Sequence, residues 1–592
     1  MAEHDPGQTS LRSRMAGDLR EHHVGSTVRL AGWVHRRRDL GGLVFVDLRD
    51  RAGIVQVSFG PEWTAEASLE GAKGLGHEQV IRVEGTVEAR PDGARNPDME
   101  TGDVEVRAVA LEVLSDARVP AIPVYRGPED EAPSEELRLR HRVLDLRRLE
   151  MQRALRLRHE LVLETRNYLD GLGFLEIETP ILTKPTPEGA RDFLVPSREH
   201  RGEFYALPQS PQIYKQILMV AGFDRYFQIA RCFRDEDLRA DRQPEFTQID
   251  LEASFVGVED VIGWTEGLMA ALARVGSVEA APPFPRMTWA EAMDRFGTDR
   301  PDLRWELEIR DWSDSLSGLG FRILDSAVES GGRIRGLHLK GGGSLSRKDV
   351  EAIEARAKAV GAPGLLWVKR TGDGGSGPLA RFMTDEAYEA LGLGENDLAL
   401  VAAGPDAITS PALDAARRAA IGAMGLPKAR EHAWLWVVDF PVFDEDDEGN
   451  PTPSHHPFVL PREEDLDRLE EGAFGARGEA YDLVLDGTEL GGGSLRIHES
   501  ALQRRIFRVL GFEEQEIERR FGFLLDALDA GAPPHGGIAL GMDRIVQRFA
   551  GVPSLRDVIA FPKTTAARAL YEGAPTRVDA RDLNDLGIRV ET

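Results

Sequence analysis

The sequence predicts an α+β protein of several domains: an N-terminal β-barrel, an antiparallel sheet with flanking helices, and an α/β insertion. Three observations predict this architecture. At 592 residues the chain is too long for one core, and typical domain sizes suggest roughly three to four domains. Short alternating strands fill residues 1–115, whereas helix-like and strand-like runs mix further along the chain. Glycine-rich pieces interrupt this second pattern between residues 302 and 425.

Composition excludes several classes of protein. A formal charge of −27 argues against a nonspecific nucleic-acid binder, although a local basic patch at residues 35–38 still allows a specific RNA partner. The single cysteine, Cys232, excludes a disulfide framework and a cysteine-based zinc site. The polar start lacks an apolar signal core, and no apolar run is long enough to span a membrane. We therefore expect a cytoplasmic protein without a membrane partner.

Residues 1–115 have the pattern of a small barrel of the oligonucleotide-binding type. Val44, Val46 and Leu48 share one face of a strand, and Phe45 lies on the other face among polar residues. An outward phenylalanine can stack on a nucleobase. It can equally well cover the end of the barrel, and the residue pattern alone does not decide between the two.

The rest of the chain divides by its proline and glycine positions. Four prolines make residues 116–135 a linker. A first catalytic segment at 136–301 starts with a helical pattern over residues 135–169, followed by a strand at 174–179 that Pro180 ends. The arginine-rich stretch 137–158 favours a helix laced with salt bridges over an RNA patch. An insertion at 302–425 carries no cluster of reactive residues, and 426–592 completes the catalytic domain and a C-terminal extension.

A charged hairpin is the most informative local feature. Residues 226–234 and 246–255 alternate as strands around a loop rich in arginine and acids. Phe246, Gln248, Asp250 and Glu252 share one face of the second strand. A solvated surface hairpin is the simpler interpretation, but acids and amides that alternate with apolar residues favour a lined pocket for an anionic ligand such as a nucleotide.

A second hairpin carries a pair of carboxylates. Asp486-Gly487 is a strong turn signal that pairs residue 485 with 488 and residue 484 with 489. Asp482 and Glu489 then become diagonal neighbours, a poor arrangement for stability and a good one for Mg²⁺ beside a triphosphate. The glycines at 491–493 allow close approach to the backbone. Arg496 follows on the same face, where it can bind a carboxylate with two hydrogen bonds.

These motifs resemble those of the class II aminoacyl-tRNA synthetases, specifically the bacterial aspartyl enzymes. Residues 233–250 resemble motif 2, the helix–strand–proline segment resembles motif 1, and residues 536–544 resemble motif 3. Residues 32–39 resemble the anticodon-binding barrel of these enzymes. The resemblance runs from about residue 19 to residue 563. Bacterial aspartyl enzymes also carry an insertion between motifs 2 and 3.

The resemblance implies a role for each matching residue. The implied catalytic residues are Arg234, Glu489 and Arg544. Aspartate ligands would be Glu188, Ser210, Gln212, Lys215, Arg234, Asp250, His455 and Arg496. ATP ligands would be Arg234, Asp235, Glu236, Gln243, Glu489, Gly541, Met542, Asp543 and Arg544. Asp482 and Glu489 would hold Mg²⁺. The anticodon would contact Arg38, Phe45 and Gln56, with His35 and Gly93 near its last base.

The implied reaction joins L-aspartate to tRNA(Asp) through an aspartyl-adenylate, with ATP as substrate and a homodimer as the working form. His35 and Gly93 resemble the relaxed type that also charges tRNA(Asn), which would require a downstream tRNA-dependent amidotransferase. Three alternatives remain: a strictly discriminating aspartyl enzyme, an asparaginyl enzyme, and a non-catalytic RNA-binding paralogue. Arg496 and the insertion argue against the second. The third requires loss of Arg234, Glu489, Arg496 or Arg544, and all four are present.

Overall fold

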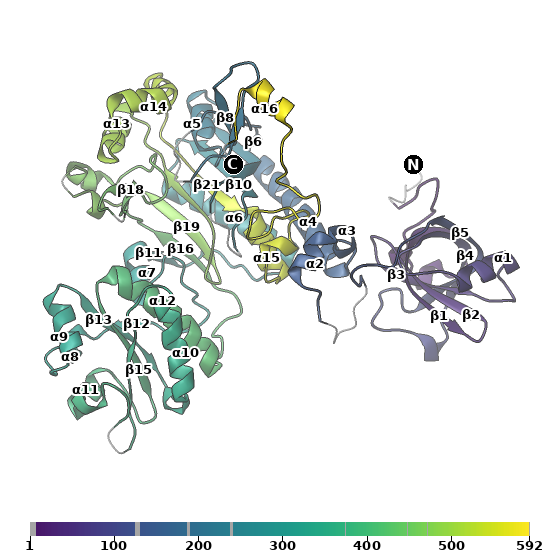
Figure 1. Cartoon of the computed structure of the whole chain (residues 1–592), viewed down its shortest axis with the longest axis horizontal. Coiled ribbons are helices and arrows are strands. Elements are labelled where there is room, and N and C mark those ends of the chain that lie inside the picture. Colours follow the sequence, from purple (N-terminus) through teal and green to yellow (C-terminus); the bar gives the residue numbers. More distant parts are fainter. Residues whose placement is uncertain are drawn as a thin grey trace. The chain divides into compact units, whose positions relative to one another are not determined.

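The computed structural model describes residues 7–124, 131–185, 190–236, 241–372, 375–446, 448–470 and 472–590 (Figure 1). Glu188, one of the expected aspartate ligands, lies outside these residues. The chain forms two compact units. The first contains residues 1–156 and 556–577, and the second contains residues 157–555 and 578–592.

The first unit contains a closed five-stranded barrel, as the sequence predicts. Its strands are β1 (Thr27–Leu40), β2 (Leu43–Arg49), β3 (Ile54–Phe59), β4 (Val80–Ala89) and β5 (Val104–Ser115), in the order β1-β2-β3-β5-β4. Only β3 and β5 pair in parallel. Val44, Val46 and Leu48 are fully buried in the barrel core, which confirms the predicted inward face of β2.

The predicted continuous helix over residues 135–169 is wrong, because the chain forms three helices there. They are α2 (Glu135–Arg140), α3 (Arg142–Asp145) and α4 (Leu149–Gly171). The breaks bring three arginines onto Asp145, which is fully buried and accepts hydrogen bonds from Arg138, Arg142 and Arg148. The arginine stretch is therefore rich in salt bridges, as expected, but its central pairs are buried rather than solvated. Residues 116–124 and 131–134 contain no helix or strand.

The second unit is built on an eight-stranded sheet. In spatial order its strands are β11 (Arg286–Thr288), β16 (Trp434–Val438), β19 (Ala480–Leu485), β20 (Thr488–Leu495), β21 (His535–Gly541), β10 (Glu245–Ser254), β9 (Arg225–Phe233) and β6 (Leu175–Glu176). The six inner strands pair antiparallel, and the two edge strands pair in parallel. Helices α6 (Val258–Gly276) and α15 (Met542–Ala550) pack against this sheet and each other.

Strand β6 is shorter than the predicted strand at residues 174–179, which is a correction. Only Leu175 and Glu176 pair with β9. Beyond them, the backbone N–H of Thr179 donates to the side-chain oxygen of Gln228 at 3.0 Å instead of a strand carbonyl. The backbone N–H of Ile177 still donates to the carbonyl of Phe227 at 3.1 Å, so backbone pairing with β9 stops between residues 177 and 179.

The insertion is an α/β layer structure, as the sequence predicts. Its sheet has the order β12 (Ile309–Asp311), β13 (Arg333–Leu339), β15 (Leu398–Gly404) and β14 (Leu366–Lys369). Helices α10 (Arg347–Lys358) and α12 (Asp406–Met424) contribute to one hydrophobic core of the insertion. Helices α8 (Ser313–Leu316), α9 (Arg322–Glu329) and α11 (Asp385–Ala390) contribute to a second hydrophobic core. Helix α7 (Trp289–Phe296) precedes it and contacts α12.

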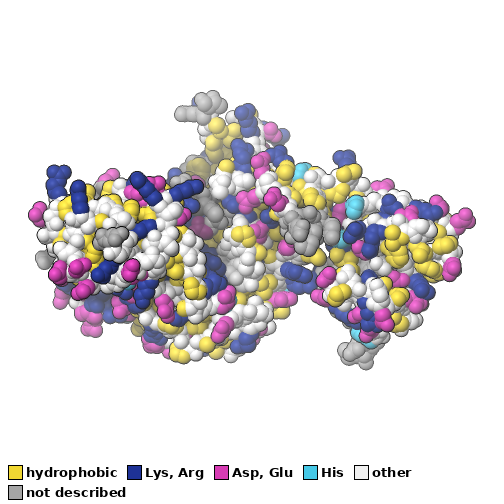
Figure 2. All heavy atoms as spheres, turned by 90° about the horizontal axis from the view of Figure 1, so that it is seen from below, with side chains coloured by type: hydrophobic (Ala, Val, Ile, Leu, Met, Phe, Trp, Pro, Cys, Tyr) yellow, Lys and Arg dark blue, Asp and Glu magenta, His cyan; other side chains and the backbone are white. Residues whose placement is uncertain are grey.

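The remaining helices complete the second unit. Helix α5 (Gln212–Val220) packs against α14 (Glu514–Asp529), and α14 packs against α13 (Ser500–Val509). Among the described residues, no helix is long and apolar enough to cross a membrane. The face shown in Figure 2 mixes acidic and basic side chains, so the net charge of −27 does not collect there in one patch.

Candidate active site

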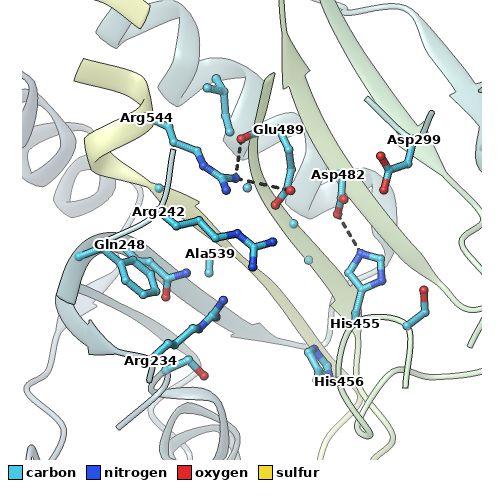
Figure 3. A pocket seen from close by; sticks show the side chains of 18 of the residues that line it. Arg234, Arg242, Gln248, Asp299, His455, His456, Asp482, Glu489, Ala539 and Arg544 are labelled. Carbon is cyan, nitrogen blue, oxygen red and sulfur yellow. Dashed lines mark hydrogen bonds and ion pairs between the residues drawn. The ribbon is translucent and has the colours of Figure 1, made fainter. Parts of the chain in front are cut away.

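A cavity of about 760 Å³ lies on the eight-stranded sheet (Figure 3). Its walls come from β10, β19, β20 and β21, from the starts of α5 and α15, and from the segment after α7. Most of the predicted site residues line it together: Ser210, Gln212, Lys215, Arg234, Glu236, Gln243, Asp250, His455, Asp482, Glu489, Arg496, Gly541, Asp543 and Arg544. The structure therefore brings residues from five separate stretches of sequence into one polar hollow.

The charged hairpin forms one side of this cavity. Strand β9 pairs with β10, and Phe246, Gln248 and Asp250 face the hollow, as the strand periodicity predicts. The guanidinium carbon of Arg234 lies 5.1 Å from the centre of the Phe246 ring. This stacking directs a positive charge into a cavity wall, which suits an anionic ligand.

Two cations and two acids meet at the inner end of the cavity. Lys215 Nζ lies 2.6 Å from Asp250 Oδ1 and 3.2 Å from Glu252 Oε2. Arg496 donates from Nε to Glu252 at 2.9 Å and from Nη2 at 3.1 Å. All four side chains are at most 1% exposed. Burial raises the pKa of Asp250, which Lys215 opposes.

Helix α5 places an amide beside this cluster. Gln212 is its first residue, and Lys215 follows three positions later on the same side of the helix. The Gln212 side-chain nitrogen is buried and has no hydrogen-bond partner within the described part of the chain. Because such a buried donor is costly when unpaired, it is suited to a polar ligand group.

The second hairpin forms the opposite wall and follows the predicted register at its turn. Leu485 pairs with Thr488 and Val484 with Glu489, after which a bulge places Asp482 opposite Gly492. A Cβ at position 492 would lie 2.3 Å from Asp482 Oδ1. The glycine is therefore required for the close approach that the sequence predicts.

Asp482 and Glu489 each have a positive neighbour. His455 Nε2 lies 2.9 Å from Asp482 Oδ1, and Arg544 Nη1 lies 3.5 Å from Glu489 Oε2. Burial, with Glu489 as a further cause, raises the pKa of Asp482 to about 6. Although burial lowers the pKa of His455, the Asp482 carboxylate outweighs it, and the net direction is upward.

The two carboxylates fit a hard divalent cation. Oxygen ligands that face a polar cavity are those that Mg²⁺ takes, with substrate phosphates and water filling the other positions. Within the described residues, no group of three His, Cys, Asp or Glu side chains is arranged to hold a metal ion. The chain alone therefore does not form a complete metal cage here.

Helix α15 begins directly at the cavity. Its third residue, Arg544, donates from Nη1 to the carbonyl of Glu489 at 2.8 Å. Asp543 is already engaged, because it accepts from the backbone N–H of Thr247 at 3.0 Å and pairs with Arg158. A positive side chain at a helix N-terminus favours a bound phosphate.

Two predicted nucleotide ligands do not line the cavity. The Met542 side chain is fully buried in the core. Asp235 is exposed, and its backbone N–H donates to Arg191 at 3.1 Å. Their side chains therefore lie outside the hollow.

The structure adds residues that the sequence reasoning missed. Arg242 lines the cavity and pairs with Glu236 at 3.0 Å. His456 Nε2 lies 2.6 Å from Arg496 Nη1. Asp299, after α7, and Pro411 of α12 also contribute to the wall. The charged loop and the paired histidines were available signals for the first two, whereas only tertiary structure reveals the last two.

The barrel residues that are predicted to contact the anticodon differ in their surroundings. Arg38 donates to Asp47 at 2.9 Å and to Gln56 at 3.0 Å, so these polar groups share one patch. Phe45 lies half-buried on the same strand as Asp47. Gly93 is exposed, and a Cβ there would contact nothing within 4 Å.

His35, which is expected near the last anticodon base, is buried in the barrel. It is 6% exposed, and its Nδ1 lies 2.8 Å from Arg49 Nη1. Arg49 in turn pairs with Glu78 through Nη2 at 2.7 Å. A bulge between Val34 and Arg36 turns two consecutive residues inward. Burial, reinforced by Arg49, lowers the pKa of His35 to about 4.

Comparisons with known proteins identify two matching families. Residues 28–114 match the OB-fold nucleic acid binding domain, and residues 134–565 match tRNA synthetases class II (D, K and N). The aspartate--tRNA(Asp/Asn) ligase of Bacillus cytotoxicus is 49% identical over 98% of this chain and 99% of its own length. The ligase of the same name from Bacillus subtilis is 48% identical over 98% of this chain and 99% of its own.

Solved structures share the fold at low identity. The asparaginyl-tRNA synthetase of Pyrococcus horikoshii with asparaginyl-adenylate gives a TM-score of 0.57 at 20% identity, covering 92% of this chain and 96% of that one. A putative aspartyl-tRNA synthetase from Leishmania major gives 0.59 at 17% identity, covering 94% and 95%. At these identities the likeness concerns the fold alone.

Proposed function

Because the chain belongs to the class II tRNA synthetases (D, K and N), we propose that it attaches L-aspartate to tRNA(Asp), and also to tRNA(Asn), using ATP. The observation that carries this proposal is the buried cation pair, Lys215 and Arg496, at the inner end of the cavity. Two cations suit an amino acid with two carboxylates. The names of the 49% and 48% identical relatives support the same substrate.

The first step forms the adenylate. An oxygen of the aspartate α-carboxylate bonds to the α-phosphorus of ATP, and the bond from that phosphorus to diphosphate breaks. Arg234, stacked on Phe246, faces the negative charge that develops at phosphorus, and Arg544 at the start of α15 faces the leaving phosphates. No covalent intermediate with the enzyme is needed, because orientation and charge carry the reaction.

In the second step, the 3′-hydroxyl of the terminal adenosine of the tRNA attacks the acyl carbon of the adenylate, and AMP leaves. Arg38, Phe45 and Gln56 of the barrel offer a charged, aromatic and amide surface for anticodon bases. His35 is buried and contacts Arg49, so any effect of it on the anticodon would pass through its neighbours. We expect this reaction in the cytoplasm, where tRNA and ATP both occur.

Asp482 and Glu489 would hold Mg²⁺, which supplies charge neutralisation to the phosphates of ATP when it is bound. Asp482→Asn removes one negative oxygen, so we expect weaker binding of the ion, by about tenfold. The electron paramagnetic resonance of added Mn²⁺ measures this affinity without turnover. Exposed Glu463→Gln, outside the cavity, is the matched control. Equal affinity in the Asp482 variant and the control would contradict the assignment.

We propose a homodimer, which exposed apolar side chains of the second unit support. Leu163 of α4, Leu175 of β6, Leu182 and Leu194 are 50%, 51%, 52% and 56% exposed. Such residues are expected to lie in an interface. Sedimentation of the full chain should give twice the monomer mass, and Leu175→Glu should lower that mass; a monomer at micromolar concentration would contradict the dimer.

Aminoacylation tests the main proposal. Radiolabelled aspartate should be attached to both tRNA(Asp) and tRNA(Asn) transcripts, with no attachment of asparagine. Charging of tRNA(Asp) alone would identify a discriminating enzyme, and charging with asparagine would overturn the substrate. Aspartyl-tRNA(Asn) requires a further enzyme that converts the aspartyl group to an amide, so a tRNA-dependent amidotransferase is the expected downstream partner.

A further inference from the structure

Residues 297–308, here called the connecting segment, join α7 to the insertion and contain no helix or strand. The segment reaches the active site with its first residues, because Gly297, Thr298 and Asp299 line the cavity. The carboxylate of Asp299 interacts electrostatically with that of Asp482, one of the two acids that would hold Mg²⁺ (Figure 3). Part of the cavity wall beside the expected metal therefore comes from the connecting segment.

The same segment supports the turn of the β19–β20 hairpin, whose strands carry both expected Mg²⁺ ligands. A Cβ at Gly487, in the turn, would lie 2.9 Å from the Cβ of Asp302. Arg304 pairs with Asp302 at 2.7 Å, and its Nε lies 3.7 Å from Oδ1 of Asp486. The connecting segment therefore contacts this hairpin at its turn as well as bordering the cavity beside it.

A buried arginine of the insertion holds the connecting segment. Arg417 of α12 is fully buried. Its guanidinium donates hydrogen bonds to the backbone carbonyls of Leu307, Asp302 and Trp305. The guanidinium carbon lies 5.1 Å from the centre of the ring of Phe296, the last residue of α7. Because the guanidinium is a rigid fork of donors, one side chain fixes three backbone positions of the segment.

The backbone of α12 also confines the start of the segment. Gly297 has a φ of +71°, and a Cβ there would lie 2.3 Å from the carbonyl oxygen of Ser410. Pro411, the next residue of α12, lines the cavity itself. A displacement of α12 would therefore displace the residues that the connecting segment contributes to the cavity wall.

We infer that Arg417 is a positioning residue through which the insertion sets the affinity of the active site for the Mg²⁺–nucleotide. It holds the connecting segment, and the segment supports the hairpin that carries Asp482 and Glu489. Arg417 acts through these neighbours, since it does not line the cavity. The inference rests on the proposed function, which assigns this side of the cavity to ATP.

Arg417→Met tests the inference, with added Mn²⁺ alone as the probe. The variant keeps a long side chain but removes its donors, so the segment loses three hydrogen bonds. We expect the affinity for Mn²⁺, measured by electron paramagnetic resonance, to fall by about tenfold, the lower range for loss of a group that orients metal ligands. Arg417→Lys keeps the charge and should recover part of the affinity.

ATP–diphosphate exchange separates positioning from general damage. In Arg417→Met the KM for ATP should rise by about fivefold or more, because the wall beside the phosphates is no longer held in place. The KM for aspartate should change by less than about twofold. The inner end of the cavity, where aspartate would bind, is built on α5 and β10 rather than on the connecting segment.

Arg304→Gln tests the other end of the segment without changing the core of the insertion. The variant removes the cation between Asp302 and Asp486, so the affinity for Mn²⁺ should fall by roughly threefold. Because both arginines act through one segment, the double variant should lose less than the product of the two single losses. A loss equal to that product overturns the shared route.

His338→Gln is the matched control. His338 is a buried residue of β13 in the insertion, where its Nε2 lies 2.7 Å from Asp397 Oδ2. It does not line the cavity. Its loss should lower the melting temperature and leave the affinity for Mn²⁺ and the KM for ATP unchanged.

Unchanged Mn²⁺ affinity in folded Arg417→Met and Arg304→Gln overturns the inference. So does an equal rise of the KM for ATP and for aspartate, or a loss of Mn²⁺ affinity in His338→Gln, because general loosening would explain either result. If Arg417→Met does not fold, Arg417→Lys and Arg304→Gln decide. With normal exchange by the unmodified protein these outcomes overturn this inference alone, whereas no aspartate-dependent exchange by the unmodified protein overturns the proposed function and this inference with it.

Discussion

Two buried carboxylates, Asp145 and Glu252, use the same chemistry for different ends. Both are fully buried, and both accept hydrogen bonds from arginine. Around Asp145 the cations turn toward the backbone: Arg142 also donates to the carbonyls of residues 556, 559 and 560, all within the first unit. That cluster joins helices α2 and α3 to a distant loop, and none of its residues lines the cavity on the eight-stranded sheet.

The cations around Glu252 instead face the cavity. Lys215 and Arg496 line the hollow, together with Asp250 and the unpaired amide of Gln212. The comparison shows that burial and ion pairing do not by themselves identify a binding site. What distinguishes the two clusters is whether the positive groups also border a space that a ligand can enter.

Among the variants that test this comparison, Arg496→Ala should have the largest effect, which is on kcat/KM for aspartate. It removes a buried positive charge that borders the cavity where the substrate carboxylate would bind, so kcat/KM for aspartate should fall by roughly a thousandfold, about 4 kcal/mol of transition-state stabilisation. The rate of aspartate-dependent ATP–diphosphate exchange measures this fall in kcat/KM. Arg496→Lys is the variant that keeps the charge without the planar donors. A fall of less than about tenfold in Arg496→Ala would place the side-chain carboxylate elsewhere in the cavity.

Asp145→Ala should lower the stability of the fold without weakening the binding of aspartate. It leaves Arg138, Arg142 and Arg148 without their shared anion, so the free energy of unfolding should fall by about 3–5 kcal/mol. The KM for aspartate of the folded protein should not change. Urea unfolding and exchange kinetics on one preparation measure both quantities. A raised KM without a loss of stability would show that the two clusters are not separate in function.

His35 belongs to a third buried cluster and gives a pH-dependent test. Because burial and Arg49 lower the pKa of folded His35 to about 4 from an ordinary value of 6.5, the unfolded chain binds its proton first on acidification. Stability from this group is complete above pH 6.5 and is lost as the pH falls toward 4, by about 3 kcal/mol in total. Hydrogen exchange of the β1 and β2 amides should show the loss.

His35→Gln keeps a polar side chain without this titration, so the pH dependence of β1 and β2 should flatten between 6.5 and 4. His159→Gln, a histidine outside the barrel, should leave the dependence unchanged. An identical acid loss in the protein and in His35→Gln would assign the titration to another group.

The sequence predicts most of the site because strand periodicity and turns are local. Alternation along β10 correctly places Phe246, Gln248 and Asp250 on one face, and Asp486-Gly487 correctly sets the register of the second hairpin. The features that the sequence does not predict depend on tertiary packing. The helix breaks to bury Asp145, and a bulge turns His35 inward, so no periodicity in either segment reveals the result.

The sequence also does not predict that the insertion contributes a residue to the cavity wall. Pro411 reaches the cavity from α12, although it lies 157 residues after the end of β10 and 69 residues before the start of β19. No local pattern marks a proline as part of a binding wall. Only the packing of α12 against α7 places it there.

Gly93→Ala should have the smallest effect on the fold and offers a clean test of tRNA choice. The added methyl group would contact nothing within 4 Å, so the free energy of unfolding should change by less than about 0.5 kcal/mol. Any effect on charging must then arise where the tRNA lies. We expect the tRNA(Asn) rate relative to tRNA(Asp) to fall by roughly fivefold or less, the range for one added methyl group. Gly475→Ala, equally open but outside the barrel, is the control, and an equal fall for both tRNAs would argue that position 93 does not read the last anticodon base.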